Sequence, residues 1–153
     1  MNYRLLLKYL GHFAMAIGVL MLPSAAWAVY FREWDELVAL LLATVVSLAV
    51  GLVLSFAGHG AANRMYQREA LGLVGLSWLL AAALGALPYV FAGVFNYVDA
   101  YFECMSGFTT TGSSVLTDIE ATAKSILFWR SFTHWLGGMG IIVLFIAVLP
   151  YLG

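Results

Sequence analysis

The 153-residue sequence is 63% hydrophobic and only 10% charged, whereas soluble globular domains are about 45–50% apolar and about 25% charged. Seven Lys and Arg residues against eight Asp and Glu residues leave a net charge of −1, so no basic field would attract a nucleic acid. The single cysteine cannot form an internal disulfide, and no Cys or His pair has the spacing of a structural zinc site. The composition therefore predicts an integral membrane protein.

Four apolar stretches approach or exceed the length of about 20 residues that a transmembrane helix needs. They cover residues 5–31, 37–58, 71–95 and 125–153. Short polar connections at 32–36 and 59–69 separate the first three. We therefore expect an all-α polytopic membrane protein with two parts, an N-terminal pair of transmembrane helices at 1–64 and a second unit at 65–153.

Positive charge predicts the orientation of these spans. Arg4, Lys8, Arg64 and Arg68 flank the ends of the first three spans on one side, whereas the connection at 32–36 has one Arg among three acids. Cytoplasmic loops of membrane proteins are enriched in Lys and Arg, so the N-terminus is expected in the cytoplasm. The segment between the third and fourth spans would then face outward.

The N-terminus has a second interpretation. Two basic residues precede an apolar run at 10–22, and the small-residue pattern at 26–28 resembles the cleavage site of a signal peptide. The apolar stretch nevertheless continues to Phe31, which is long enough to span. Pro23 would kink such a helix rather than forbid it, because neighbouring helices can satisfy the freed carbonyl.

Residues 96–124 are too polar to cross the bilayer. The run at 99–108 would form a helix about 15 Å long, which reaches about halfway through a membrane. Asn96 or Asp99 can cap its start, and Asp99 and Glu103 suit the positive end of its dipole. Its last four carbonyls would point unpaired into the membrane and favour a cation. The uncharged stretch at 109–114 that follows suits an extended strand whose carbonyls line a narrow path.

The order of these elements is that of potassium channels: an outer helix at 71–95, a pore helix and filter at 96–114, and an inner helix at 125–153. Three motifs carry a closer likeness, DAYFE at 99–103, SGFTTTGSS at 106–114 and HWLGGMGI at 134–141. They resemble the Trk, Ktr and HKT superfamily of potassium transporters, and TrkH-type subunits in particular. The resemblance implies four such repeats around one pore and two additional N-terminal helices. The chain would then be an N-terminal fragment with one of the four repeats.

The resemblance also implies a set of site residues. It assigns the potassium selectivity filter to Thr110, Thr111, Gly112 and Ser113, with potassium held by the backbone carbonyls of Thr110, Thr111 and Gly112. Filter support would come from Thr109, Glu103 and Asp99. Taken alone, TTTGSS is a common turn composition. Glu103 could be an ion ligand or a brace for the loop, and pairing of intramembrane charge favours the brace.

In the expected inner helix, Gly137, Gly138 and Gly140 suit either close helix packing or a hinge. Arg130 at the outer end of this helix is expected to snorkel to the membrane surface. Trp129 is interpreted as an interface anchor.

The function implied by the resemblance is potassium uptake, with potassium as the bound ion and no organic cofactor. Its implied setting is the bacterial inner membrane, with a homodimer and a cytoplasmic nucleotide-binding regulatory subunit as further partners. One alternative is a noncatalytic membrane anchor or assembly fragment. Another is an intramembrane hydrolase using Ser113 or Ser114 with His134. The sequence around these serines lacks a Gly-x-Ser-x-Gly elbow, so we do not expect an enzyme.

Overall fold

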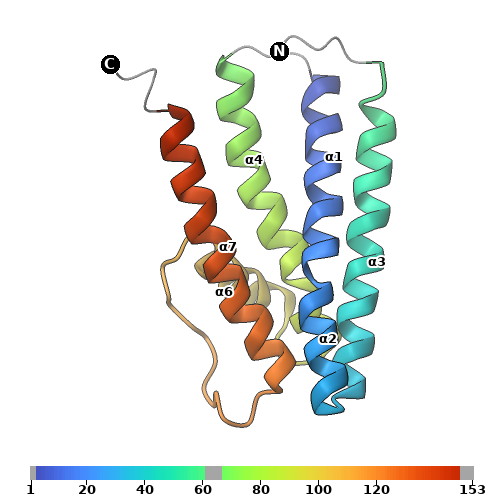
Figure 1. Cartoon of the computed structure of the whole chain (residues 1–153), viewed down its shortest axis with the longest axis vertical. Coiled ribbons are helices and arrows are strands. Elements are labelled where there is room, and N and C mark those ends of the chain that lie inside the picture. The colour runs from blue at the N-terminus through green and yellow to red at the C-terminus, as the bar shows by residue number, and fades with distance from the viewer. Residues whose placement is uncertain (1–2, 61–66, 149–153) are drawn as a thin grey trace.

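The computed structural model describes residues 3–60 and 67–148, with side chains at 3–60 and 69–142. Every regular element in these ranges is a helix: α1 (Tyr3–Leu20), α2 (Leu22–Phe31), α3 (Trp34–Ala57), α4 (Gln67–Gly85), α5 (Leu87–Phe91), α6 (Tyr97–Phe108) and α7 (Lys124–Val148). Figure 1 shows α1 and α3 side by side along their length, with α4 and α7 beside them and the short α6 behind α7. Arg64, the Arg68 side chain and residues 149–153 of the predicted fourth span lie outside the described residues.

Three helical stretches in the described part of the chain are long and apolar enough to cross a membrane. They are Tyr3–Phe31, Trp34–Ala57 and Glu69–Phe91. The first contains both α1 and α2, which are interrupted at Met21, two residues before Pro23. The predicted first span is therefore helical on both sides of an interruption near Pro23.

The predicted fourth span is helical, as α7, but it is not one of these three stretches. Its described half carries Lys124, Arg130 and His134, whose polarity offsets the apolar residues between them. The side chains beyond residue 142, where the sequence is most apolar, lie outside the described part.

Close packing of small residues holds α1 against α3. A Cβ atom at Gly51 of α3 would come within 2.8 Å of the Met15 backbone nitrogen in α1, and one at Gly18 of α1 would come within 3.1 Å of the Ser47 side chain in α3. Small residues allow membrane helices to approach in this way, which increases van der Waals contact where no hydrophobic effect drives association. The N-terminal pair is thus a packed unit.

The third span breaks at the end of α4. Pro88 lacks an amide hydrogen, and Tyr89 N donates to the Ala86 carbonyl at 3.1 Å rather than to Gly85. The freed Gly85 carbonyl accepts a hydrogen bond of 2.9 Å from the indole Nε1 of Trp129 in α7. Trp129 is fully buried, so its interpretation as an interface anchor is wrong.

The helical part of this span ends at Phe91, four residues before the predicted boundary at residue 95. Gly93, at a φ of 69°, turns the backbone out of the helix. Its amide donates to the Val90 carbonyl at 3.1 Å, and Val94 N donates to the Tyr89 carbonyl at 2.9 Å. These two bonds form a Schellman motif, in which a left-handed residue ends the helix and satisfies its last carbonyls.

The main core lies where α4, α5, α6 and α7 meet, and it extends to α1. Its fully buried side chains include Tyr89, Cys104, Ile126 and Trp129. A Cβ atom at Gly85 would overlap the Cys104 sulfur, so α6 lies directly against the break between α4 and α5. This contact fixes the height of α6 relative to the spanning helices.

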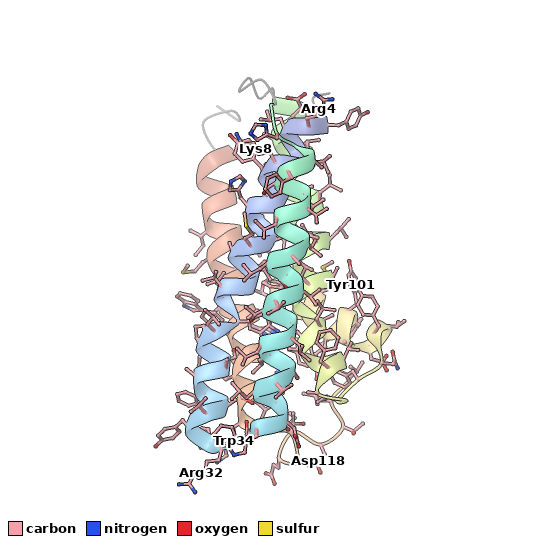
Figure 2. All side chains as sticks on the ribbon, turned by 90° about the vertical axis from the view of Figure 1, so that its right-hand side faces the viewer. Arg4, Lys8, Arg32, Trp34, Tyr101 and Asp118 are labelled. Atoms are coloured by element: carbon pink, nitrogen blue, oxygen red, sulfur yellow. The ribbon has the colours of Figure 1, made fainter. Side chains whose placement is uncertain are left out.

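The two ends of the helix bundle differ in charge. Figure 2 shows Arg4 and Lys8 at one end, and Arg32, Trp34 and Asp118 at the other. The connection between α2 and α3 and the segment between α6 and α7 therefore lie at the same end, opposite the two basic residues. The sequence predicts both connections on the side opposite the basic residues, and which side faces the cytoplasm stays a prediction.

Candidate functional site

The C-terminal end of α6 is closed by a Schellman motif with threonine at its left-handed position. Thr110 N donates to the Gly107 carbonyl at 2.9 Å, and Thr111 N donates to the Ser106 carbonyl at 3.0 Å. Thr110 has a φ of 57°, a conformation that costs a residue with a Cβ about 1–2 kcal/mol. Glycine is usual here, so this β-branched residue is an outlier of the kind found at functional sites.

This cap corrects the expectation that α6 ends in four unpaired carbonyls. Besides Gly107 and Ser106, the Met105 carbonyl is also occupied, by the Thr109 amide at 2.9 Å and the Thr109 hydroxyl at 2.8 Å. Of the last four carbonyls, only that of Phe108 receives no hydrogen bond from the described residues. The backbone reversal at Thr110 brings the following amides back to the helix end.

The loop after α6 contains three consecutive carbonyls that accept no hydrogen bond within the described ranges, those of Thr110, Thr111 and Gly112. Their neighbours on either side are occupied. The Thr109 carbonyl accepts from the Thr110 hydroxyl at 2.7 Å, and the Ser113 carbonyl accepts from the Ser106 hydroxyl at 2.6 Å. All six residues at 109–114 are exposed in this chain. The free carbonyls thus form a short, exposed row.

This row is not the extended strand that the sequence predicts. Gly112 has a φ of 79°, so left-handed backbone occurs at both Thr110 and Gly112. In a regular strand, successive residues face opposite sides, and a positive φ at every second residue breaks that alternation. A Cβ at Gly112 would have no neighbouring atom within 4 Å, so within this chain glycine is required by its backbone angle and not by close approach.

Glu103 joins α6 to the segment that follows the loop. Glu103 is 1% exposed, and its carboxylate accepts hydrogen bonds from the Ser114 hydroxyl at 2.9 Å and the Val115 amide at 2.8 Å. The guanidinium Nε of Arg130 in α7 donates to the same carboxylate. A buried carboxylate with these three donors is held in place and braces the loop. Arg130 does not snorkel, because a partner lies within its reach.

The other support residues have separate places. The Thr109 hydroxyl lies 2.8 Å from the Thr111 hydroxyl, beside the row of free carbonyls. Asp99 lies in the first turn of α6, where it accepts from Asn96 Nδ2 at 2.6 Å. The Asn96 side chain caps the helix by accepting from the amides of Val98 and Asp99. Asp99 therefore contacts the start of α6 and not the loop at its other end.

The three glycines of α7 have different surroundings. A Cβ at Gly137 would overlap the Phe108 carbonyl oxygen, whereas one at Gly138 would lie 3.9 Å from Thr110 Cγ2. At Gly140 the nearest atom would be in Trp78, at an ordinary 3.6 Å. Of these three glycines, only Gly137 is thus required for the contact between α7 and the end of α6.

Several contributors to this site were not predicted from the sequence. Ser106, Ser114 and Arg130 supply the hydrogen bonds that fix the loop. The pairing of Arg130 with Glu103 could have been predicted, because charges inside a membrane are usually paired and Glu103 lies in the preceding helix. The serines carried no such signal, because hydroxyl groups are ordinary in both loops and helices.

Comparison with known proteins decides the family. The family model named TrkH, described as a cation transport protein, matches residues 37–153. The chain belongs to the TrkH family. Its full length aligns with the Trk system potassium uptake protein TrkH of Salmonella typhimurium at 35% identity, covering 32% of that protein. An uncharacterized cation transporter of Methanocaldococcus jannaschii is 38% identical over 97% of this chain and 31% of its own length.

A solved TrkH structure has the same fold. The crystal structure of the potassium transporter TrkH from Vibrio parahaemolyticus matches 98% of this chain with a TM-score of 0.91 and 33% identity, over 32% of that chain. The chain spans about a third of the length of these relatives. The predicted resemblance to the TrkH family is confirmed, as is an all-helical membrane protein.

Membership of the TrkH family also decides the question of catalysis, because TrkH proteins are transporters and not enzymes. Two residues of the alternative hydrolase pair have other hydrogen-bond partners. The Ser114 hydroxyl donates to Glu103, and His134 Nδ1 lies 3.0 Å from the Arg130 carbonyl. The described side chains include no hydrogen bond between His134 and Ser113 or Ser114.

Proposed function

We propose that this chain supplies one quarter of a potassium-selective pore in a Trk-type uptake system. The observation that carries the proposal is the row of free carbonyls at Thr110, Thr111 and Gly112, exposed at the end of a half-length helix. Potassium filters replace the hydration shell of the ion with rings of such carbonyls. Relatives of this chain are named Trk system potassium uptake protein TrkH, which supports potassium as the ion.

The placement of α6 supports a re-entrant pore helix. Its 12 residues span about 18 Å, which is too short to cross a bilayer. After the loop, the chain runs to Asp118, at the end of the bundle that carries Arg32 (Figure 2). Irregular backbone at membrane depth is tolerated where it lines a water-filled cavity, and the proposed pore would supply that cavity in front of the free carbonyls.

The filter in this proposal consists of Thr110, Thr111, Gly112 and Ser113, and the first three hold the ion. The Ser113 carbonyl, which is bonded to Ser106, anchors the end of the row instead. Glu103 and Thr109 support it from the side of α6. No ion step requires a covalent intermediate, because the carbonyl oxygens exchange with water oxygens around the ion.

The remaining features of the proposal follow from the family. Three further repeats would complete each carbonyl ring, since one loop contributes one carbonyl to each. The whole assembly would be a homodimer with a cytoplasmic nucleotide-binding regulatory subunit, in the bacterial inner membrane. The N-terminus with Arg4 and Lys8 would lie in the cytoplasm.

Flux measurements on the intact transporter that carries this segment test the proposal. Rubidium uptake into proteoliposomes, competed with potassium or sodium, should show potassium displacing rubidium far better than sodium does. The isolated 153-residue chain should give no selective flux. Selective flux from the isolated chain, or an intact transporter that does not distinguish potassium from sodium, would refute the proposal.

A further inference from the structure

The α2–α3 connection contains a carboxylate that binds the start of α7. Glu33 Oε1 accepts from the Lys124 amide at 2.8 Å, and Glu33 Oε2 accepts from the Ser125 amide at 2.9 Å. More than 90 residues separate these partners in the sequence. We propose that Glu33 is a positioning residue for the filter, which it reaches through Arg130 and Glu103. The inference rests on the proposed function of the loop at 110–112.

The start of α7 needs an external partner. The first amides of a helix have no partner within the helix, and a negative charge there also favours the helix dipole. Ala123, which precedes α7, has no side-chain acceptor, and the first turn of α7 contains no acidic residue. Glu33 therefore supplies the cap that the local sequence lacks.

The conformation of the α2–α3 connection is unusual in a way that serves this contact. Arg32 has a φ of 60°, which costs about 1–2 kcal/mol for a residue with a Cβ. The reversal at Arg32 ends α2, with Glu33 N donating to the Ala28 carbonyl at 2.9 Å. Burial alone would raise the pKa of Glu33, but contacts with Ser125 and the amide of Lys124 outweigh it and lower the pKa. Glu33 is thus held as a carboxylate at neutral pH.

Aromatic contacts fix the same end of α7 to α2. The Trp27 ring stacks on Phe128, with ring centroids 5.2 Å apart and planes inclined by 22°. The Lys124 ammonium lies 4.4 Å from the centroid of the Phe31 ring, a cation–π distance. Residues 27–33 therefore hold the first two turns of α7 by three kinds of contact.

From this anchored end, α7 leads directly to the filter brace. Arg130 lies about 9 Å along the helix from Lys124, at 1.5 Å per residue. A helix is stiff over that distance, so a shift of its start moves Arg130 by a similar amount. Arg130 binds Glu103, and Glu103 binds the Ser114 hydroxyl and the Val115 amide. Releasing Glu33 should therefore loosen the end of the filter loop.

Hydrogen exchange in lipid nanodiscs, measured by mass spectrometry on the intact transporter, tests this connection without reference to transport. In Glu33→Ala, exchange should accelerate at residues 124–125 and also at residues 115–116, whose amides are bonded to Glu103 and Ser114. Asp35→Asn is the matched control, since it removes one negative charge from the same connection, and Asp35 has no hydrogen-bond or ion-pair partner among the described residues. It should change neither region.

Transport gives the second readout. Potassium over sodium selectivity should fall about twofold to thirtyfold in Glu33→Ala, the range for coupling through a packed network, and remain unchanged in Asp35→Asn. Glu33→Gln, which keeps the side-chain shape and one acceptor, should lie between wild type and Glu33→Ala, and it serves as the test if Glu33→Ala does not fold. Faster exchange confined to 124–125 with unchanged selectivity would overturn the inference. A failed filter assignment would appear separately, as unchanged selectivity when the filter itself is altered.

Discussion

Gly137 of α7 lies against the carbonyl oxygen of Phe108, the last residue of α6, with no room for a side chain between them. Gly138 beside it has an ordinary distance to its nearest neighbour. We predict that Gly137→Ala destabilises the protein by about 1–3 kcal/mol, the usual cost of overpacking. Gly138→Ala should be neutral or stabilising by up to about 1 kcal/mol, because alanine favours a helix.

Thermal unfolding of the two variants in detergent or nanodiscs measures this difference, and potassium selectivity measures its effect on the loop. Gly137→Ala should also lower selectivity, because it pushes the end of α6 away from α7. Equal stability of both variants would show that the contact is absent in the membrane.

Replacing Gly112 should reduce selectivity for potassium. Its φ of 79° is costly for serine by about 1–2 kcal/mol, and a loss of about 1.4 kcal/mol of differential binding is tenfold in discrimination. Gly112→Ser should therefore lower potassium over sodium selectivity about tenfold while expression stays near wild type. Thr111→Ser, which keeps the carbonyl and the hydroxyl, should be much milder.

Gly93→Ser is the control for backbone strain. Gly93 also has a positive φ, 69°, and equally open surroundings, but it lies at the end of α5. Gly93→Ser should lose about as much stability as Gly112→Ser, without a loss of potassium selectivity. If selectivity collapsed in Thr111→Ser but did not change in Gly112→Ser, the assignment of the filter to Gly112 would be wrong.

Breaking the ion pair between Arg130 and Glu103 should be severe. Arg130→Met leaves a buried carboxylate without its cation, at a cost of about 3–5 kcal/mol. In the double variant Glu103→Gln with Arg130→Met, no buried charge remains, so part of this loss should be recovered. The test is the free energy of unfolding of the two variants. Ser114→Ala, which removes one hydrogen-bond donor to Glu103, is the comparison and should lower the stability by about 1–3 kcal/mol. A double variant that is less stable than Arg130→Met would contradict the assignment of Glu103 as a paired charge.

The carboxylate of Glu33 predicts a pH dependence. Its pKa is lowered from the ordinary value of 4.5, so its stabilising contribution is present above that value and is lost as pH falls through the lowered pKa. Thermal stability should therefore drop on acidification below about pH 4.5. Glu33→Gln, which cannot titrate, should be less stable at neutral pH and should lose less on acidification. If thermal stability fell equally with pH in the wild type and in Glu33→Gln, the result would contradict this role of Glu33.

The proposed orientation is testable with reporter fusions. Alkaline phosphatase, which is active only outside the cytoplasm, should be active when fused after Glu36 and silent when fused after Gly60. The reverse pattern would invert the topology. An N-terminus that begins at Val29 in the purified protein would establish cleavage of the first span as a signal peptide.

Much of the fold was predictable because membrane-spanning helices need long apolar runs. The charged residues between the apolar runs delimit the first two spans. The capping residue Asn96 marks the start of the half-length α6. The break of the third span at Gly85 was not predicted, since Pro88 is compatible with a continuous helix when a neighbour satisfies the freed carbonyl. That neighbour is Trp129, and nothing local in the sequence pairs the two residues.

The chemistry of the loop was less predictable than its position. The TTTGSS stretch indicated where free carbonyls would lie, but not that Thr110 adopts a left-handed conformation, which threonine rarely does. The Schellman bonds that hold Thr110 also occupy the carbonyls that a simple helix end would leave free. Likewise, Glu33 was interpreted only as part of an acidic connection, because its partners are backbone amides whose proximity depends on tertiary packing.

The burial of Cys104 has a practical consequence for labelling. Its thiol packs against Gly85 in the core, and it is the one cysteine in this sequence. Thiol reagents in the aqueous phase should therefore leave the native segment unmodified. A cysteine introduced at an exposed position such as Asp118 can then carry a fluorophore or spin label with the natural residue retained. Motion of the segment between α6 and α7 can then be followed without disturbing the packing of Cys104 against Gly85.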